Sequence, residues 1–411
     1  MRLAPNTRLA PVSLAENRSS IDQAVEAGLL SGAVTLVWQH GEVLQVNEIG
    51  HRDVEAQLPM RRDTIFRIAS MTKPVTVAAA MALVEEGKLA LTDPISRWVP
   101  EMAEMRVLVD PAGPLDQTIA AQRQITIDDL MTHRAGLAYS FSVGGPIARA
   151  YAKVSLRQEA DDWLAEVARL PLVHQPGERL TYSQSTEVLG IVLSRVEGKP
   201  LQTILSERIF EPLGMADTGF WVSPEKRERA ATMYRLDASD GLRHDAMGPV
   251  PVREPRFSQG GAGLLSTVDD YLRFARMLLD GGEVDGVRVL SEDSVRRMRA
   301  DHLTDEQKKH PFLGMPFWTG RGFGLNLSVV TDPSKSSRLF GPGGLGTFSW
   351  PGAYGTWWQA DPENELILIY LIQNYPDLTS AAAAVAGNTA LAKLQAVQPK
   401  FVKRTYSALG L

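Results

Sequence analysis

Strand-forming runs lie near both ends of the chain, and this placement constrains the fold more than any other feature. Residues 32–50 (G-A-V-T-L-V-W-Q-H-G-E-V-L-Q-V-N-E-I-G) contain two runs rich in β-branched residues around His40-Gly41, a pattern that predicts a β-hairpin. The later strand-like runs span 322–330, 356–361 and 364–373. Because strands at both ends must find partners, we predict one antiparallel sheet built from the two terminal parts.

The middle of the chain, from about residue 90 to 255, has helical patterns, for example at 156–170 and 185–198, and a last helix is predicted over 381–394. The simplest arrangement is therefore an α+β fold, in which helices flank the antiparallel sheet and a mostly helical domain is inserted. We expect residues 1–88 plus 258–411 to form the α/β domain and 89–257 the helical domain, with an active site at their interface.

A short motif precedes an apolar run near the start. Residues 66–76 read F-R-I-A-S-M-T-K-P-V-T, and 75–87 are apolar on nearly every side until Glu85, which predicts a helix buried on all sides. Ser70 and Lys73 are three residues apart, so they share a helix face. A serine nucleophile with a lysine of lowered pKa, at a helix N-terminus that favours an oxyanion, is a suitable arrangement for covalent catalysis.

The same spacing also arises by chance. A second S-x-x-K, Ser223-Pro-Glu-Lys226, is typical of a helix start, with Ser223 as N-cap and a solvated lysine. Ser70 could equally be only a helix cap, so this motif alone does not establish catalysis.

Composition excludes several classes of function. The net charge of −5, from 43 basic and 48 acidic residues without a basic run, gives no electrostatic basis for nucleic-acid binding. Without cysteine there is no disulfide, thiolate nucleophile or cysteine-bound zinc, and the seven histidines show no H-x-H or H-x-x-x-H spacing. We expect no metal and no cofactor. No apolar run reaches the roughly 18 residues of a membrane span, and no secretory signal is visible, so we expect a cytoplasmic protein that does not bind membranes.

Two further stretches carry candidate site residues. Residues 176–190, P-G-E-R-L-T-Y-S-Q-S-T-E-V-L-G, place Tyr182 just before an apolar helix, where a half-buried packing role is the alternative. Residues 341–358, G-P-G-G-L-G-T-F-S-W-P-G-A-Y-G-T-W-W, contain a formal G-x-G-x-x-G that leads into a strand instead of a helix, which argues against a dinucleotide loop. We interpret it as a glycine-lined strand edge open to a ligand.

Together these stretches resemble the serine β-lactamase and penicillin-binding-protein superfamily, in particular the family VIII carboxylesterases, which share the class C β-lactamase fold. I-F-R-I-A-S-M-T-K resembles the S-x-x-K motif in its usual setting. L-M-T-H-R-A-G-L (130–137), P-G-E-R-L-T-Y-S-Q and G-G-A-G-L-L-S-T-V-D-D (260–270) resemble further shared segments, in the same order over most of the chain.

The resemblance implies that Ser70 is the acylated nucleophile and that Lys73 and Tyr182 move its proton; which of the two takes it stays open. The triplet Trp350-Pro351-Gly352 resembles the W-x-G of the esterases, where β-lactamases carry K-T-G or H-x-G. An indole in place of a cation favours uncharged esters, with Trp350 as an apolar wall. The resemblance also implies that the N–H groups of Ser70 and Ala353 form the oxyanion hole.

The remaining expected substrate-binding residues are Gly352, Gln184, Thr356 and Tyr139. Gln184 and Thr356 depart from the family's asparagine and histidine, which disfavours β-lactam and amide recognition. Core packing is the alternative for Tyr139, and we interpret His133 and Arg134 as structural.

The predicted function is hydrolysis of short-chain, uncharged carboxylic esters through an acyl-enzyme. A β-lactamase or amidase, an acyltransferase and a non-catalytic binding protein of the same fold are the alternatives. The expected partner is a small-molecule ester; the sequence does not indicate an oligomeric state. No G-x-S-x-G is present, so a nucleophile-elbow hydrolase has no visible serine to use.

Overall fold

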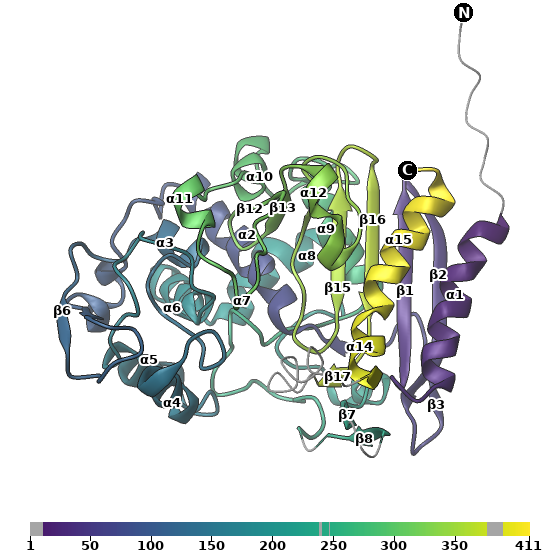
Figure 1. The fold of residues 1–411 in the computed structure, drawn as a ribbon, viewed down its shortest axis with the longest axis horizontal. Helices are drawn as coiled ribbons and strands as arrows, with labels where there is room; N and C mark the ends of the chain where they lie inside the picture. The colour runs from purple at the N-terminus through teal and green to yellow at the C-terminus, as the bar shows by residue number, and fades with distance from the viewer. Residues whose placement is uncertain (1–10, 238–240, 246, 376–388) are drawn as a thin grey trace, which may run out of the picture.

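The computed structural model describes residues 11–237, 241–245, 247–375 and 389–411, and its largest sheet is an eight-stranded antiparallel sheet in the right half of Figure 1. From edge to edge the strands are β12 (Arg321–Phe323), β13 (Ser328–Val330), β14 (Phe348–Ser349), β15 (Trp357–Asp361), β16 (Leu366–Leu371), β1 (Gly32–Gln39), β2 (Glu42–Asp53) and β3 (Leu58–Pro59). β1 pairs with β2 on one side and with β16 on the other, with Val34 opposite Leu371. The prediction of one sheet built from both ends of the chain is confirmed.

The predicted hairpin joins β1 to β2 through a two-residue turn. Gln39 pairs with Glu42, and His40 and Gly41 between them both have positive φ angles, of 49° and 86°. Two consecutive residues with positive φ are typical of a type I′ turn, whose twist matches that of the strands it connects.

The strand-like run at 322–330 does not form one continuous strand. It contributes to two antiparallel strands, β12 and β13, because the chain reverses between Phe323 and Ser328. Asn326 lies in the reversal with φ of 57°, a conformation that asparagine tolerates better than most residues.

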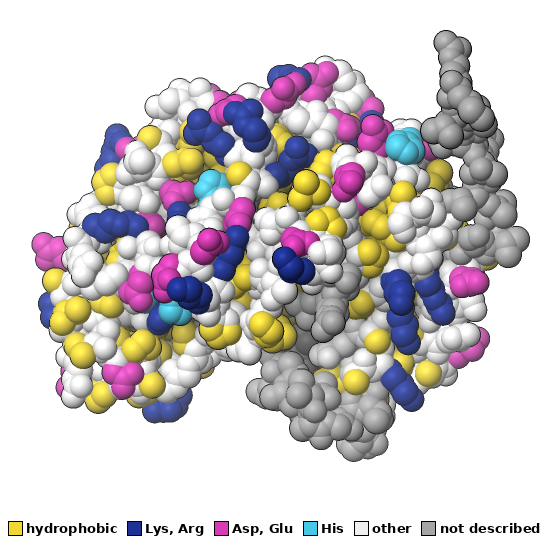
Figure 2. All heavy atoms as spheres, turned by 45° about the horizontal axis from the view of Figure 1, so that its top comes forward, with side chains coloured by type: hydrophobic (Ala, Val, Ile, Leu, Met, Phe, Trp, Pro, Cys, Tyr) yellow, Lys and Arg dark blue, Asp and Glu magenta, His cyan; other side chains and the backbone are white. Residues whose placement is uncertain are grey.

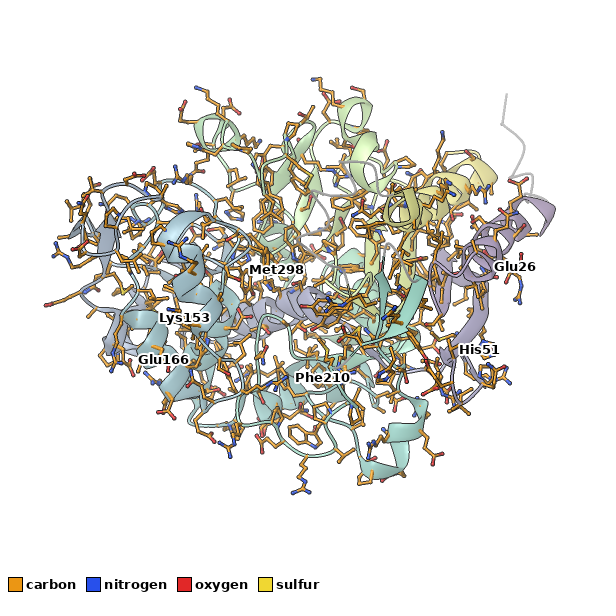
Figure 3. All side chains as sticks on the ribbon, turned by 60° about the horizontal axis from the view of Figure 1, so that its bottom comes forward. Glu26, His51, Lys153, Glu166, Phe210 and Met298 are labelled. Atoms are coloured by element: carbon orange, nitrogen blue, oxygen red, sulfur yellow. The ribbon has the colours of Figure 1, made fainter. Side chains whose placement is uncertain are left out.

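Helices cover both faces of the sheet (Figure 1). α1 (Pro11–Glu26), α14 (Thr389–Gln395) and α15 (Val397–Leu409) lie on one side, where Ile21 and Phe401 pack against Val37 and Leu368. α9 (Val268–Leu279) covers the other face, within a larger core that extends into the helical middle part of the chain. Phe210 and Met298, labelled in Figure 3, are buried in this larger core. The predicted helix 381–394 is described only from Thr389; the rest lies outside the described residues.

The buried helix predicted at 75–87 is α2 (Thr72–Glu85). Every residue from Thr72 to Leu83 is buried, and the Ala-rich centre combines strong helix propensity with side chains small enough for close packing. The chain leaves the helix at Gly87, which has φ of 68°. α2 therefore runs through the middle of the molecule, and its buried packing holds the residues at its N-terminal end in place.

The middle part contains the predicted helices with somewhat different ends. Its helices are α3 (Ile127–Met131), α4 (Gly145–Lys153), α5 (Ala160–Ala168), α6 (Ser185–Glu197), α7 (Leu201–Leu205) and α8 (Glu211–Leu213). A capping box between Thr126 and Asp129 starts α3, and Gly198, with φ of 64°, ends α6. α6 packs against α2, which positions the segment preceding α6 beside the start of α2.

The remaining elements are short. The strands are β4 (Phe66–Arg67), β5 (Arg106–Leu108), β6 (Thr118–Ala120), β7 (Tyr234–Asp237), β8 (Gly241–His244), β9 (Leu265–Ser266), β10 (Glu283–Val284), β11 (Val287–Arg288) and β17 (Asn374–Tyr375); the helices are α10 (Glu292–Met298), α11 (Asp305–Lys308) and α12 (Pro333–Phe340). Basic and acidic side chains are interspersed across the face shown in Figure 2. Among the described residues, no helix is both long and apolar enough to span a bilayer.

Candidate active site

Ser70 lies in a single 3₁₀ turn, Ala69–Met71, that leads directly into α2. The preceding residue, Ala69, has φ of +46°, which is unfavourable for a residue with a Cβ. Strained backbone of this kind persists only where the surrounding structure enforces it, and it is concentrated at functional sites. Ser70 itself is half-buried, so its hydroxyl is held firmly without being sealed off.

Lys73, in the first turn of α2, is fully buried, which is rare for a lysine. Its Nζ lies 3.2 Å from Ser70 Oγ, 3.1 Å from the Tyr139 hydroxyl and 2.7 Å from the Gly261 carbonyl oxygen. An ammonium group has three N–H donors, and each one has an acceptor here. Since a buried charge is tolerated only when it is hydrogen-bonded, this arrangement suits a protonated lysine.

Tyr182 comes from the loop before α6, and its hydroxyl lies 2.8 Å from Ser70 Oγ. The Lys73 ammonium lies 4.9 Å from the centre of the Tyr182 ring, within cation–π range. Ser70 Oγ is therefore within hydrogen-bonding distance of both Lys73 and Tyr182, the two groups predicted to move its proton. Tyr182 is buried, with 8% of its surface exposed. Its hydroxyl is hydrogen-bonded to Ser70, so it has more than the packing role that was the alternative interpretation.

Trp350 follows β14. It was predicted to form an apolar wall beside the substrate, but its observed contact is with Tyr182. It is only 2% exposed, and its Nε1–H donates a 3.2 Å hydrogen bond to the Tyr182 hydroxyl oxygen. A donor directed at a phenol oxygen favours the ionised form. Trp350 thus acts on Tyr182, and it presents almost no surface to a ligand.

A carboxylate that the sequence analysis missed lies behind this group. Glu187, in the first turn of α6, is buried, and the Tyr139 hydroxyl donates to its Oε1 over 2.9 Å. Tyr139 therefore connects Lys73 to Glu187, while its half-buried ring stacks on Phe141. One signal in the sequence could have revealed Glu187, because it is a lone acid on the apolar side of a predicted helix.

The predicted oxyanion segment packs directly against the chain that leads to Ser70. Thr356 Oγ1 donates to the Ile68 carbonyl over 3.2 Å, and Gly352 N–H donates to the Thr356 carbonyl over 2.8 Å. A Cβ on Gly352 would overlap Thr356 Oγ1 and the Ile68 carbonyl oxygen, so this close approach requires glycine. Gly352 and Thr356 hold the turn that presents Ala353, which is exposed, and their contact with a substrate stays a prediction.

Gln184, also predicted to bind substrate, is buried at the N-cap position of α6, and its Oε1 has no hydrogen-bond partner in the described part of the chain. His133 and Arg134 have the contacts of structural residues. His133 is fully buried, with its Nδ1 3.1 Å from Ser183 Oγ and its ring against Tyr182, and burial together with the positive charge of Lys73 holds its pKa well below the usual value.

Two motifs from the sequence are absent from this site. The backbone N–H groups of Gly344 and Leu345, in the glycine-rich segment, donate to the carboxylates of Asp361 and Glu363, so the segment is closed by its own acids and not open to a ligand there. In the second S-x-x-K, Ser223 precedes a 3₁₀ helix (Pro224–Arg229) and Lys226 pairs with Asp217 over 2.8 Å.

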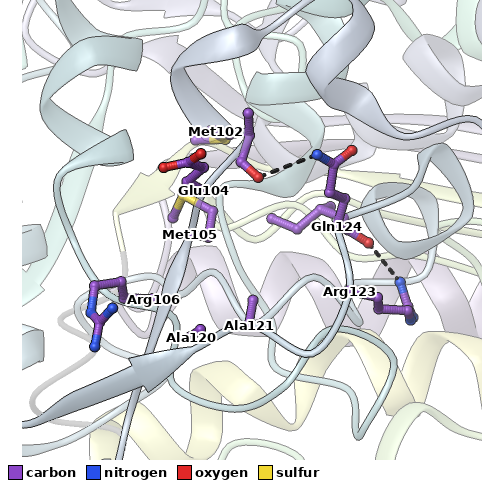
Figure 4. A pocket seen from close by; sticks show the side chains of 10 residues that line it. Met102, Glu104, Met105, Arg106, Ala120, Ala121, Arg123 and Gln124 are labelled. Carbon is purple, nitrogen blue, oxygen red and sulfur yellow. Dashed lines mark hydrogen bonds between the residues drawn. The ribbon is translucent and has the colours of Figure 1, made fainter.

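A separate pocket of about 410 Å³ beside β5 and β6 is lined by residues 102–106, 120, 121 and 123–125 (Figure 4). Arg123 donates there to the Gln124 carbonyl and pairs with the buried Asp129, so its charge is already balanced. Ser70, Lys73 and Tyr182 do not line this pocket. Among the described residues, no group of three or more histidine or acidic side chains could hold a metal ion.

Known proteins with similar sequences and structures include hydrolases. An uncharacterized protein of Mycobacterium tuberculosis is 67% identical over 401 residues, 97% of this chain and all of that protein. Esterase EstB of Burkholderia gladioli is 33% identical over 377 residues, 86% of this chain and 88% of EstB. The structure of EstCE1, described as a hydrolase with promiscuous acyltransferase activity, is similar with a TM-score of 0.76 and 27% identity, covering 94% of this chain and 99% of EstCE1.

The fold is that of the serine β-lactamases and penicillin-binding proteins, whose members include esterases and acyltransferases, as predicted. The matched region, residues 17–399, contains all the site residues described above. The chain belongs to the Beta-lactamase family.

Proposed function

We propose that this protein is a serine carboxylesterase that hydrolyses short-chain, uncharged esters through an acyl-enzyme on Ser70. One observation carries the proposal: Ser70 Oγ lies 2.8 Å from the Tyr182 hydroxyl and 3.2 Å from Lys73 Nζ. A serine hydroxyl is a weak nucleophile until a base removes its proton, and both groups are within reach to do so. The similarity to esterase EstB supports the same reaction.

In the proposed reaction, Ser70 Oγ attacks the ester carbonyl as its proton passes to the pair formed by Lys73 and Tyr182. The carbonyl oxygen becomes an oxyanion bound by the N–H groups of Ser70 and Ala353. The tetrahedral intermediate collapses, and the alcohol leaves with the proton returned from that pair. Water then attacks the acyl-enzyme by the same route and releases the acid.

The surroundings of Tyr182 favour apolar substrates. Phe141 stacks on Tyr139 and is 45% exposed, and Phe312, which contacts Tyr182, is followed by the exposed Leu313 and by Met315. At the position where β-lactamases have a cation for a substrate carboxylate, Trp350 supplies only an indole N–H, which is already bonded to Tyr182. A small apolar ester fits such a site better than a β-lactam or peptide anion.

A panel of p-nitrophenyl esters from acetyl to decanoyl, assayed alongside nitrocefin, tests this proposal. We expect the acetyl and butyryl esters to be hydrolysed fastest and nitrocefin to remain intact. Efficient nitrocefin hydrolysis without ester turnover would show instead that the site is that of a β-lactamase.

A second candidate function is acyl transfer to an alcohol, which the described acyltransferase activity of EstCE1 supports. The same acyl-enzyme serves both reactions, because only the acceptor differs. Adding an excess of a simple alcohol to the butyrate assay separates the two: ester formation at the expense of free acid indicates a transferase, whereas free acid alone indicates a hydrolase.

Trp350→Phe should lower kcat/KM by about tenfold or more, the effect of losing one hydrogen bond to a charged group. Without the indole N–H the Tyr182 hydroxyl oxygen loses the donor that holds it beside Ser70 Oγ. Trp358→Phe is the matched control, since Trp358 is equally buried but its Nε1–H has no hydrogen-bond partner in the described structure. Equal effects in the two variants would show that only packing is lost.

A further inference from the structure

Glu187 is a buried acid for which the reaction described above has no use. It is 1% exposed, and burial raises the pKa of its carboxyl group, although the nearby Lys73 and the Tyr139 hydroxyl oppose this. A carboxylate is costly to bury unless other groups compensate for its charge. The contacts of Glu187 show which group does so.

Three groups form a directed chain of hydrogen bonds. The Tyr139 hydroxyl lies 2.9 and 3.2 Å from the two oxygens of Glu187, and its oxygen lies 3.1 Å from Lys73 Nζ. A phenol has a single proton, which it donates to Glu187, so its oxygen is left to accept from Lys73. This direction requires a donor at the lysine end and an acceptor at the glutamate end.

Within the described part of the chain, the neighbouring titratable groups do not offer another partner for the charge of Glu187. Tyr139 stays protonated, because burial and the charge of Glu187 raise its pKa well above 10. His133 stays neutral, because burial and Lys73 lower its pKa. Tyr182 is hydrogen-bonded to Ser70 and Trp350.

The backbone near Lys73 leaves room for this carboxylate. A Cβ on Gly261 would overlap both oxygens of Glu187, and the carbonyl of the same residue accepts the third hydrogen bond of Lys73. Glycine at 261 therefore lets one segment contact the lysine and the acid together.

We propose that Glu187 is a positioning residue that, through Tyr139, holds Lys73 as an ammonium ion, so that Tyr182 and not Lys73 receives the proton of Ser70. The inference rests on the proposed function. It assigns separate tasks to the two groups that contact Ser70: Lys73 supplies a fixed positive charge, and Tyr182 supplies the base. Without the carboxylate, the Lys73 ammonium ion is less stable. Its proton then moves in part to the Tyr182 phenolate, so a smaller share of the molecules has the phenolate base.

Glu187→Gln tests this, because it keeps the size and the acceptor for Tyr139 but removes the charge. We expect the plateau of kcat/KM to fall by at least about tenfold. In part of the molecules the proton of the Lys73 ammonium moves to the Tyr182 phenolate, and the resulting neutral pair holds the same number of protons but has no phenolate base. A negative charge raises the pKa of nearby bases, so its removal should move the acid limb to lower pH by about one unit. Glu187→Asp, which restores the charge, should return the limb towards that of the wild type.

Glu197→Gln is the control, since Glu197 ends the same helix but pairs with Lys88 and Arg208; its pH profile should be that of the wild type. If Glu187→Gln does not fold, Tyr139→Phe carries the test. It removes the hydroxyl that donates to Glu187, so the buried acid takes up a proton and loses its charge, and the plateau and the acid limb should again both fall. A loss of rate with an unmoved limb, or no loss at all, overturns the inference.

The experiments distinguish an incorrect proposed function from an incorrect role for Glu187. A wild type that neither hydrolyses esters nor reacts with a serine-directed phosphonate overturns both proposals. An active wild type whose acid limb is the same in Glu187→Gln overturns only the assignment of Glu187. The rate of phosphonate labelling against pH provides a second readout of the same limb.

Discussion

Ser70→Ala is expected to reduce hydrolysis of p-nitrophenyl acetate and butyrate to the uncatalysed background, a loss of at least about 10⁴-fold in kcat/KM. The substitution removes one oxygen from a half-buried side chain and leaves the turn Ala69–Met71 in place. We therefore expect the thermal unfolding transition to stay close to that of the wild type, so that the loss reports on the nucleophile and not on folding.

Ser223→Ala is the matched control for this loss. Ser223 belongs to the second S-x-x-K, whose Lys226 is bound to Asp217 near the surface. The variant should retain full activity. Residual turnover in Ser70→Ala above a few per cent, or inactivation of Ser223→Ala, would show that Ser70 is not the nucleophile.

Tyr182→Phe is expected to lower kcat by at least a hundredfold, roughly the contribution of one positioned proton-transfer group. It removes only the hydroxyl that lies 2.8 Å from Ser70 Oγ and leaves the ring contacts with His133 and Trp350. Because the ring remains, KM should change little, and the acid limb that belongs to the base should disappear. Lys73→Ala should cause a loss of similar size.

Tyr370→Phe is the matched control, because it measures how much turnover changes when a buried tyrosine hydroxyl outside the site is removed. Tyr370 lies on β16, and its hydroxyl has no hydrogen-bond partner within the described part of the chain. Turnover of Tyr370→Phe should equal that of the wild type. A Tyr182→Phe variant with near-normal kcat would remove Tyr182 from the mechanism.

Local patterns were sufficient to predict much of the fold. The β-branched runs around His40-Gly41 and the apolar run after Lys73 each form the predicted element, because hydrophobic periodicity and turn chemistry act over a few residues. The run at 322–330 was predicted less well, since the reversal at Asn326 depends on a left-handed conformation that no glycine or proline marks at that residue.

The candidate site was predictable only in part, because its contacts are made through space. Ser70 and Tyr182 are 112 residues apart, and only the resemblance to a family connected them. Nothing local indicates that the indole of Trp350 points its N–H at Tyr182, or that Thr356 bonds to the carbonyl of Ile68. Trp350 and Thr356 were both predicted to bind the substrate. A sequence shows the type of a side chain but not the direction in which it points.

Mass spectrometry after treatment with a serine-directed alkyl phosphonate tests the central claim most directly, because the reagent needs an activated serine but no knowledge of the natural ester. We expect one adduct per chain, on the peptide that contains Ser70, with labelling lost in Ser70→Ala and strongly slowed in Tyr182→Phe. An unlabelled protein, or an adduct on a serine other than Ser70, would contradict the account.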